Sequence, residues 1–188
     1  MLEDYKRALE RLGLLDEKVI RWLTTIDWEP GEDTFGFSIE KPLDLNVAAT
    51  SLQVRPVVEC WGADSSNEEL WYQAGLLFDT ERLKASTDWF EQDFHPEAAG
   101  VVWHTMRAFS QAFPTRVIYF VHEAWSLDLM SYHRDQEGDL WRFDLALVPQ
   151  TLFTRFSPLP STYISHEFPY GWGVVQKEWQ PVLPWLAG

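Results

Sequence analysis

The chain has 188 residues, of which 29 are acidic and 15 are basic, so its formal net charge is −14. A negative field of this size repels nucleic acid, whose binding requires Lys and Arg at the phosphates, and it disfavours anionic membrane surfaces. The composition, 46% hydrophobic and 23% charged, is that of a folded globular protein rather than a disordered chain.

The excess of acidic residues has two explanations. It can attract a basic protein and speed the encounter with it. It can equally keep in solution a chain that is rich in aromatic residues, with 11 Trp, 12 Phe and 6 Tyr. Because Trp is enriched at protein interfaces, we expect several of these side chains near the surface.

The cysteine content and the first residues indicate the compartment. Cys60 is the only cysteine, so the chain forms no internal disulfide, as is typical of a reducing environment. The first residues, MLEDYKRALERLG, are charged and amphipathic, unlike a secretory signal, and the apolar runs are shorter than a membrane span. We expect a cytoplasmic protein.

Residues 2–12 and 16–26 predict two short helices. Gly13 is suited to the end of the first helix and Asp16 to the cap of the second. A helix-turn-helix DNA-binding motif has a similar pattern, but the acidic surroundings argue against it. Apolar residues recur at helical spacing at Tyr5, Ala8, Leu9, Leu12, Val19, Ile20, Leu23 and Ile26.

Strands are predicted next, over 35–39, 52–61 and 70–78, where apolar residues alternate with polar ones or form β-branched runs. The last two form a hairpin around the polar loop 63–69. Pro56 cannot donate to a ladder, so its strand is expected at an edge or bulged.

The best helix of the chain is predicted at 96–113. Pro96 suits its first turn and Pro114 ends it. Packed on the sheet, this helix would cover one face with its apolar stripe, formed by Ala98, Val102, Met106, Phe109 and Phe113.

Residues 116–149 predict three strands. Ile118 to Val121 is apolar on both faces, as in a central strand. Residues 125–133 and 141–147 alternate and predict a hairpin about the charged turn 134–139. In the second strand of this hairpin, one face is formed by Trp141, Phe143, Leu145 and Leu147.

The last forty residues contain six of the 11 prolines, interleaved with aromatic residues, and predict an irregular wrap with one further strand near 173–179. The sequence thus predicts a single α+β domain over 1–188. It has an antiparallel sheet of five to six strands, the main helix 96–113 on one face, and two short N-terminal helices. The helical pair is 1–26, the body 34–148 and the wrap 149–188.

No residue pattern predicts catalysis, a metal or a cofactor. The five histidines lack metal-ligand spacing, and in a strand His122 and Glu123 point to opposite faces. The GxSxG, P-loop and GxGxxG patterns are absent. Cys60 lies on the apolar face of a predicted strand, where a buried and inert thiol is expected.

Acidic residues cluster in three predicted loops, at 27–33, 64–69 and 135–139. Such clusters are ordinarily solvated. Alternatively, they surround exposed Trp and Tyr side chains and form a surface for a basic partner, because hot spots favour aromatic residues ringed by polar groups. The residues that best fit this second interpretation are Trp125, Tyr132, His133, Asp135, Glu137, Asp139 and Trp141.

The leading hypothesis is a small acidic intracellular protein that binds and neutralises a basic protein partner, in the manner of a bacterial immunity protein or antitoxin. The second is a small enzyme or ligand-binding domain with an aromatic-lined pocket, using His104, His122, Glu123 and Asp128. A third is a subunit of a larger assembly. We expect a binding protein rather than an enzyme.

Overall fold

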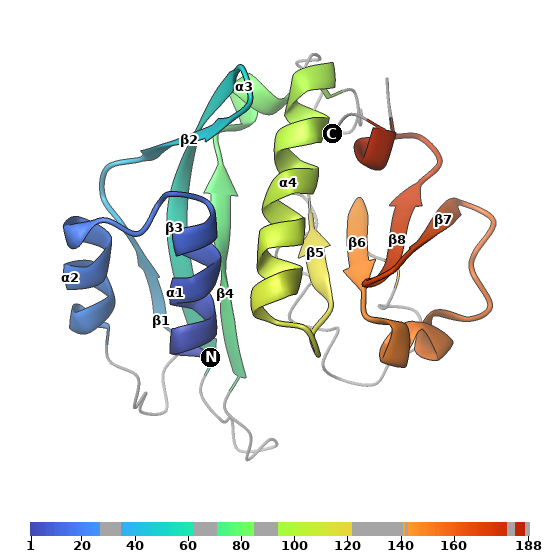
Figure 1. The fold of residues 1–188 in the computed structure, drawn as a ribbon, viewed down its shortest axis with the longest axis horizontal. Coiled ribbons are helices and arrows are strands. Elements are labelled where there is room, and N and C mark those ends of the chain that lie inside the picture. Colours follow the sequence, from blue (N-terminus) through green and yellow to red (C-terminus); the bar gives the residue numbers. More distant parts are fainter. Residues whose placement is uncertain are drawn as a thin grey trace. The chain divides into compact units, whose positions relative to one another are not determined.

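The structure is a computed structural model that describes residues 1–26, 35–61, 71–84, 94–121, 141, 143–179 and 183–186. It combines helices with antiparallel sheets, as the α+β prediction requires (Figure 1). The strands form two sheets, where the sequence predicted one. The chain divides into two compact units, Met1–Thr80 and Glu81–Gly188, with one sheet in each. Whether the two units unfold together, as a single domain would, stays a prediction.

The predicted N-terminal helices are confirmed as α1 (Leu2–Arg11) and α2 (Glu17–Thr25). Gly13 follows α1 with a φ of +68°, a conformation that glycine adopts without strain. The Asp16 carboxylate caps α2 by accepting the Val19 N–H at 2.9 Å. The predicted apolar positions are buried except Ile20, which is exposed.

One side chain attaches α1 to the sheet of the first unit. Tyr5 is fully buried, and its hydroxyl lies 2.8 Å from the Gly75 carbonyl oxygen and 3.3 Å from that of Val57. These two residues face each other on neighbouring strands, and α1 runs alongside these strands in Figure 1. Burial raises the pKa of Tyr5, so the neutral phenol is favoured here.

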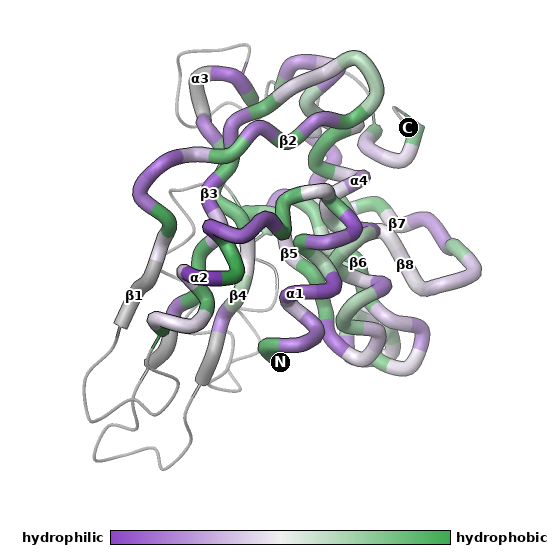
Figure 2. Tube along the Cα trace, turned by 60° about the vertical axis from the view of Figure 1, so that its left-hand side comes forward, coloured by the Kyte–Doolittle hydropathy of each residue, from purple (hydrophilic) through white to green (hydrophobic). Residues whose placement is uncertain are grey.

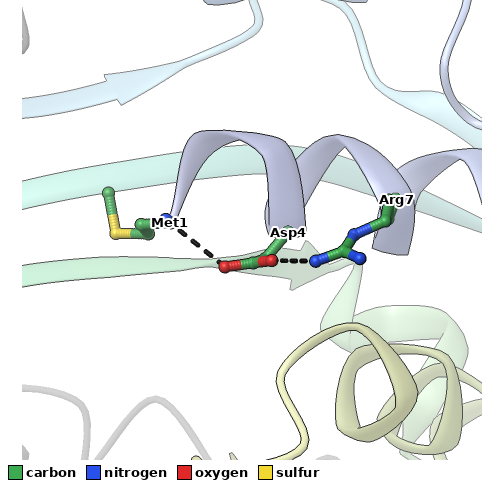
Figure 3. Close-up of polar contacts among 3 residues, drawn as sticks. All are labelled: Met1, Asp4 and Arg7. Carbon is green, nitrogen blue, oxygen red and sulfur yellow. Dashed lines mark hydrogen bonds and ion pairs between the residues drawn. The ribbon is translucent and has the colours of Figure 1, made fainter.

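The opposite side of α1 is polar, and hydrophilic and hydrophobic residues follow each other along its trace (Figure 2). The Asp4 carboxylate contacts the Arg7 guanidinium and lies 3.3 Å from the N-terminal amine of Met1 (Figure 3). The hydrogen bond from Arg7 lowers the pKa of Asp4. Ion pairs of this exposed kind contribute little to stability.

The first sheet is organised around β3 (Thr50–Trp61), which pairs antiparallel with three strands. β4 (Trp71–Phe78) occupies one side, as the predicted hairpin requires. The other side is shared by β1 (Phe35–Ser38) and β2 (Leu43–Val47). The sequence analysis missed β2, which is only five residues long.

Pro56 lies in the centre of this sheet, so its predicted edge position is wrong. It pairs with Leu76 of β4, and on the other side its carbonyl oxygen accepts the Ile39 N–H at 3.4 Å. The N and O atoms of one strand residue point to the same side, so the nitrogen of Pro56 also faces that second side. β1 ends at Ser38 and β2 begins at Leu43, and the missing N–H falls between them. A gap between two partner strands thus accommodates the missing N–H of Pro56 as well as a sheet edge would.

The second unit has the strand order β5-β6-β8-β7, and every neighbouring pair is antiparallel. The predicted main helix is confirmed as α4 (Pro96–Ala112). Short helical turns complete this unit, with α3 (Thr80–Leu83) at the boundary to the first. The remaining elements are β5 (Ile118–Phe120), β6 (Leu145–Val148), η3 (Gln150–Phe156), β7 (Tyr163–Phe168), β8 (Gly171–Gln176) and η4 (Pro184–Leu186).

The predicted hairpin of 125–133 with 141–147 is wrong in its second strand. β6 pairs with β5 on one side and with β8 on the other, so neither of its edges is left for another strand. The chain bends at Asp144. Phe143 therefore packs with Ala146 and Val148. The alternation of the sequence had predicted that Phe143 and Leu145 share a face. Residues 125–133 lie outside the described part.

Two further expectations are corrected by the order of this sheet. Among the described residues, β5 stands at one end of the order rather than in the centre. Residues 149–188 were expected to be an irregular wrap with one strand near 173–179. That strand is β8, and the wrap also supplies β7, which was not predicted. Pro169 and Tyr170 form a two-residue turn between these strands. The described prolines of this region, Pro149, Pro158, Pro160, Pro169 and Pro184, all lie outside the strands.

Gly171 provides a test of the β7–β8 turn. Its φ is +143°, and a Cβ atom there would lie 2.3 Å from the Val148 carbonyl oxygen. We expect Gly171→Ala to lower the free energy of unfolding by about 2 kcal/mol or more, because backbone atoms cannot easily move away. Gly75→Ala is the matched control, since a Cβ atom there meets nothing within 4 Å. Urea titration measures both, and equal stability of the two variants would contradict the prediction.

Candidate functional site

The predicted contact residues lie within one stretch of the sequence, 125–141. Six of them fall outside the described residues: Trp125, Tyr132, His133, Asp135, Glu137 and Asp139. The strands on either side of the segment 122–140 are described and pair with each other. Phe120 pairs with Leu145, and the Asp144 N–H donates to the Phe120 carbonyl oxygen at 3.1 Å.

Trp141, the one described member of the predicted site, is half-buried and lies among the residues that lead into β6, which we call the return segment. Its ring centroid is 5.2 Å from that of Tyr163, 5.6 Å from that of Phe156 and 6.1 Å from that of Phe143. These neighbours belong to a buried cluster that also contains Ala146 and Val174. Trp141 thus contributes to the packing of the second unit.

A polar network holds the return segment against the sheet. The Tyr163 hydroxyl donates to the Phe143 carbonyl oxygen at 2.9 Å and also contacts the Trp141 carbonyl oxygen. The Gln176 side-chain amide donates to the same Phe143 oxygen at 2.9 Å and to the Tyr163 hydroxyl at 3.3 Å. Side chains of β7 and β8 therefore bind the backbone carbonyl groups of Trp141 and Phe143, which precede β6.

Asp144 carries a carboxylate in this region and is completely buried. Its backbone connects two strands, because its N–H donates to Phe120 and its carbonyl oxygen accepts the Gln176 N–H at 3.1 Å. Burial raises the pKa of Tyr163 to about 12, and the negative charge of Asp144 acts in the same direction. The hydrogen bonds with Phe143 and Gln176 act in the opposite direction and are outweighed.

A second candidate surface was missed by the sequence analysis. On the α4 side of the sheet, four rings that are at least partly exposed and the buried ring of Trp103 form what we call the aromatic strip, with Phe168 at its centre. The Phe168 ring contacts those of His166 at 4.7 Å, Trp103 at 5.2 Å, Tyr170 at 5.4 Å and Trp185 at 6.2 Å. A usable signal existed in the alternation of His166, Phe168 and Tyr170, which places rings on one face of a strand.

The strip ends at a cation on α4. The Arg107 guanidinium carbon lies 5.7 Å above the ring centroid of Tyr170, which is 39% exposed. His104, a candidate for the ligand-binding hypothesis, is also exposed on α4. Its proposed partners His122, Glu123 and Asp128 lie outside the described residues.

Among the residues that the structure describes, no three His, Cys, Asp or Glu side chains are grouped so that they could hold a metal ion. In the same part of the chain, every helix is too short or too polar to span a membrane.

The net charge is concentrated in the connections between the described elements. The segments 27–34, 62–70, 85–93 and 122–140 contain 15 of the 29 acidic residues and, in Arg134, only one of the 15 basic residues. The rest of the chain therefore has 14 residues of each sign, and these four segments account for the whole net charge of −14.

Two of these acidic segments are attached to the same end of the first sheet. The segment 27–34 leads into Phe35 at the start of β1, and Phe35 pairs with Cys60 near the end of β3. The segment 62–70 connects Trp61 to Trp71, which pair with each other at that end. Strand pairing thus brings together the attachment points of two predicted acidic clusters that are distant in the sequence.

Comparison with known proteins adds no assignment, because no protein-family model, no curated protein and no solved structure matches the chain.

The packing of Trp141 can be tested by removing its ring. We expect Trp141→Ala to lower the free energy of unfolding by about 2 kcal/mol, less than for a fully buried Trp because the side chain is half-buried. Trp141→Phe, which keeps an aromatic ring against Tyr163 and Phe156, should lose less. Urea unfolding monitored by circular dichroism measures both. If Trp141→Ala were as stable as the wild type, the packing role would be refuted.

The raised pKa of Tyr163 predicts a loss of stability at alkaline pH. A phenol whose pKa is higher in the folded state stabilises the fold below its unfolded pKa of about 10. That contribution is lost as the pH rises toward its folded pKa of about 12. We expect Tyr163→Phe to be less stable than the wild type at pH 8 and to lose less stability between about pH 10 and 12. Unfolding measured across this range tests the sign, and parallel pH profiles would contradict it.

Proposed function

We propose that this protein is a non-catalytic binding protein whose acidic segments recognise a basic protein partner. The observation that carries the proposal is the separation of charge along the sequence. The segments 27–34, 62–70, 85–93 and 122–140 have a net charge of −14, and the rest of the chain has a net charge of zero. A chain that needed acidic residues only for solubility could distribute them over every exposed face. Their concentration in four segments favours recognition.

Aromatic residues accompany these charges. Trp28, Trp89 and Trp125 lie within three of the acidic segments, and the fourth segment is flanked by Trp61 and Trp71. Protein interfaces combine aromatic anchors with a polar surround, and complementary charge increases the rate of encounter. Immunity proteins and antitoxins that block a basic toxin would use this chemistry, and we propose a bacterial, cytoplasmic protein of that kind.

The test uses a charge reversal on the segment 122–140. We expect Asp135→Lys, Glu137→Lys and Asp139→Lys together to abolish capture of a basic protein by the immobilised chain, while the circular dichroism spectrum stays unchanged. The matched control reverses Glu10, Glu40 and Glu178, which are exposed in the described part and give the same change in net charge. The control variant should retain the partner.

Binding kinetics then distinguish recognition from adhesion. For the protein retained by the wild type and the control, the association rate should fall about tenfold or more between ~0.05 and ~0.5 M salt. Equal capture by both reversed variants, or an association rate that does not depend on salt, would refute the proposal.

A further inference from the structure

The edge strand β7 carries backbone groups that point out of the sheet. Its ladder with β8 pairs Phe168 with Gly171, and the Lys177 N–H donates to the Thr162 carbonyl oxygen at 2.8 Å. In an antiparallel ladder, hydrogen-bonded pairs alternate with pairs whose N–H and C=O groups point away. The groups of Ser165 and Glu167 therefore point away from β8. Among the described residues, no other strand pairs with β7.

Tyr163 is the third residue of β7 whose backbone groups point away from β8, and its N–H group already has a partner. The Tyr163 N–H donates to the Pro160 carbonyl oxygen at 3.0 Å, so its outward donor has a partner within the chain. Pro169 follows the strand and has no N–H group. Ser165 and Glu167 retain both their donors and their acceptors, and we call these four groups the β7 edge. The Tyr163 carbonyl oxygen points in the same direction but lies outside this set.

We propose that two copies of this chain associate by antiparallel pairing of their β7 edges about a two-fold axis at His166. In this register Ser165 of each copy lies opposite Glu167 of the other, and each pair exchanges two hydrogen bonds. All of the outward groups of the β7 edge are then paired.

Other symmetric registers fail on the same residues. An axis at Glu167 would place two carboxylates opposite each other and would set Ser165 against Pro169, which cannot donate. An axis at Ser165 would require the Tyr163 N–H, which already donates to Pro160. An axis at Ile164 would require that same donor. The axis at His166 is the symmetric choice within β7 that avoids each of these conflicts.

Side chains on both faces of the strand suit this register. On the face of the aromatic strip, half-buried Phe168 lies opposite half-buried Ile164 of the second copy, so the pairing covers apolar surface that is partly exposed in one chain. On the other face the Ser165 hydroxyl can donate to the Glu167 carboxylate. The exposed His166 rings lie side by side at the axis.

The expected association is weak and reversible. A pairing of six-residue strands is smaller than the standard interface of about 800 Å² per partner, so we expect a dissociation constant of about 1–100 µM. The net charge of −14 on each copy opposes association. Salt should therefore strengthen this dimer, whereas it should weaken binding of a basic partner. The two proposals can fail separately.

Sedimentation equilibrium tests the association. We expect the mass of the wild type to rise from 22.0 kDa toward twice that value with increasing concentration. Ser165→Pro removes an outward N–H without touching the ladder to β8, and His166→Lys places two ammonium groups at the axis. Each should weaken association about tenfold or more, and His166→Lys still tests the proposal if Ser165→Pro fails to fold. Thr154→Lys, which adds one charge at an exposed position of η3, should not weaken it.

Cross-linking tests the register. In a Cys60→Ser background, His166→Cys should give a disulfide-linked dimer on mild oxidation, because residues opposite each other have Cβ atoms roughly 4.5–5.5 Å apart. Glu167→Cys should not, because the two copies of residue 167 are diagonal neighbours at about 7–8 Å. A wild type that stays monomeric above ~200 µM, a dimer unaffected by the edge variants, or preferential cross-linking at residue 167 would overturn the proposal.

Discussion

The second unit depends on the pairing of β8 with β6 on one side and β7 on the other. This double pairing places Gln176 and Tyr163 beside the carbonyl groups of Phe143 and Trp141, where they hold the return segment. It also brings three rings close to Gly173. A Cβ atom at Gly173 would lie 3.1 Å from Phe168, Trp103 and Trp185, so a side chain there would require these rings to shift by a few tenths of an ångström.

The same pairing decides what the unit presents outward. Each even-numbered residue of β7 pairs with an odd-numbered residue of β8, and paired residues share a face of the sheet. The even-numbered residues of the two strands therefore point to opposite faces. His166 and Phe168 therefore join the α4 side, while Glu167 points to the side of η3 and accepts a hydrogen bond from Gln150. One register thus produces the aromatic strip and the outward backbone groups of the β7 edge.

The two proposed associations use different chemistry on different parts of the chain. Recognition of a basic partner would draw on four segments that carry the net charge, and self-association would draw on a strand whose contacts are backbone groups and apolar side chains. Screening acts on them in opposite directions, because charge attracts the partner and repels the second copy. The state of the protein would then depend on ionic strength and on its own concentration.

Local signals predicted the helices well. Asp16 before α2 and Pro96 at the start of α4 are caps whose effect is confined to one turn, so the sequence alone places them. The hairpin of β3 and β4 is likewise set by neighbouring residues. The pairing of β6 with β8 could not be predicted from local signals, because paired residues such as Leu145 and Val175 are far apart in the sequence. The alternation of apolar residues indicates a strand but not its neighbour in the sheet.

For the candidate site, the sequence identified acidic clusters and aromatic neighbours but not how they are combined. Composition and order determined the net charge, the main helices and several of the strands of this protein, because these depend on residue type and local spacing. Only the tertiary structure decided that Trp141 packs into a buried cluster, that Pro56 lies between two partners of a central strand, and that β7 is an edge. Each of these features depends on contacts between residues that are distant in the sequence, and such contacts exist only once the sheets have formed.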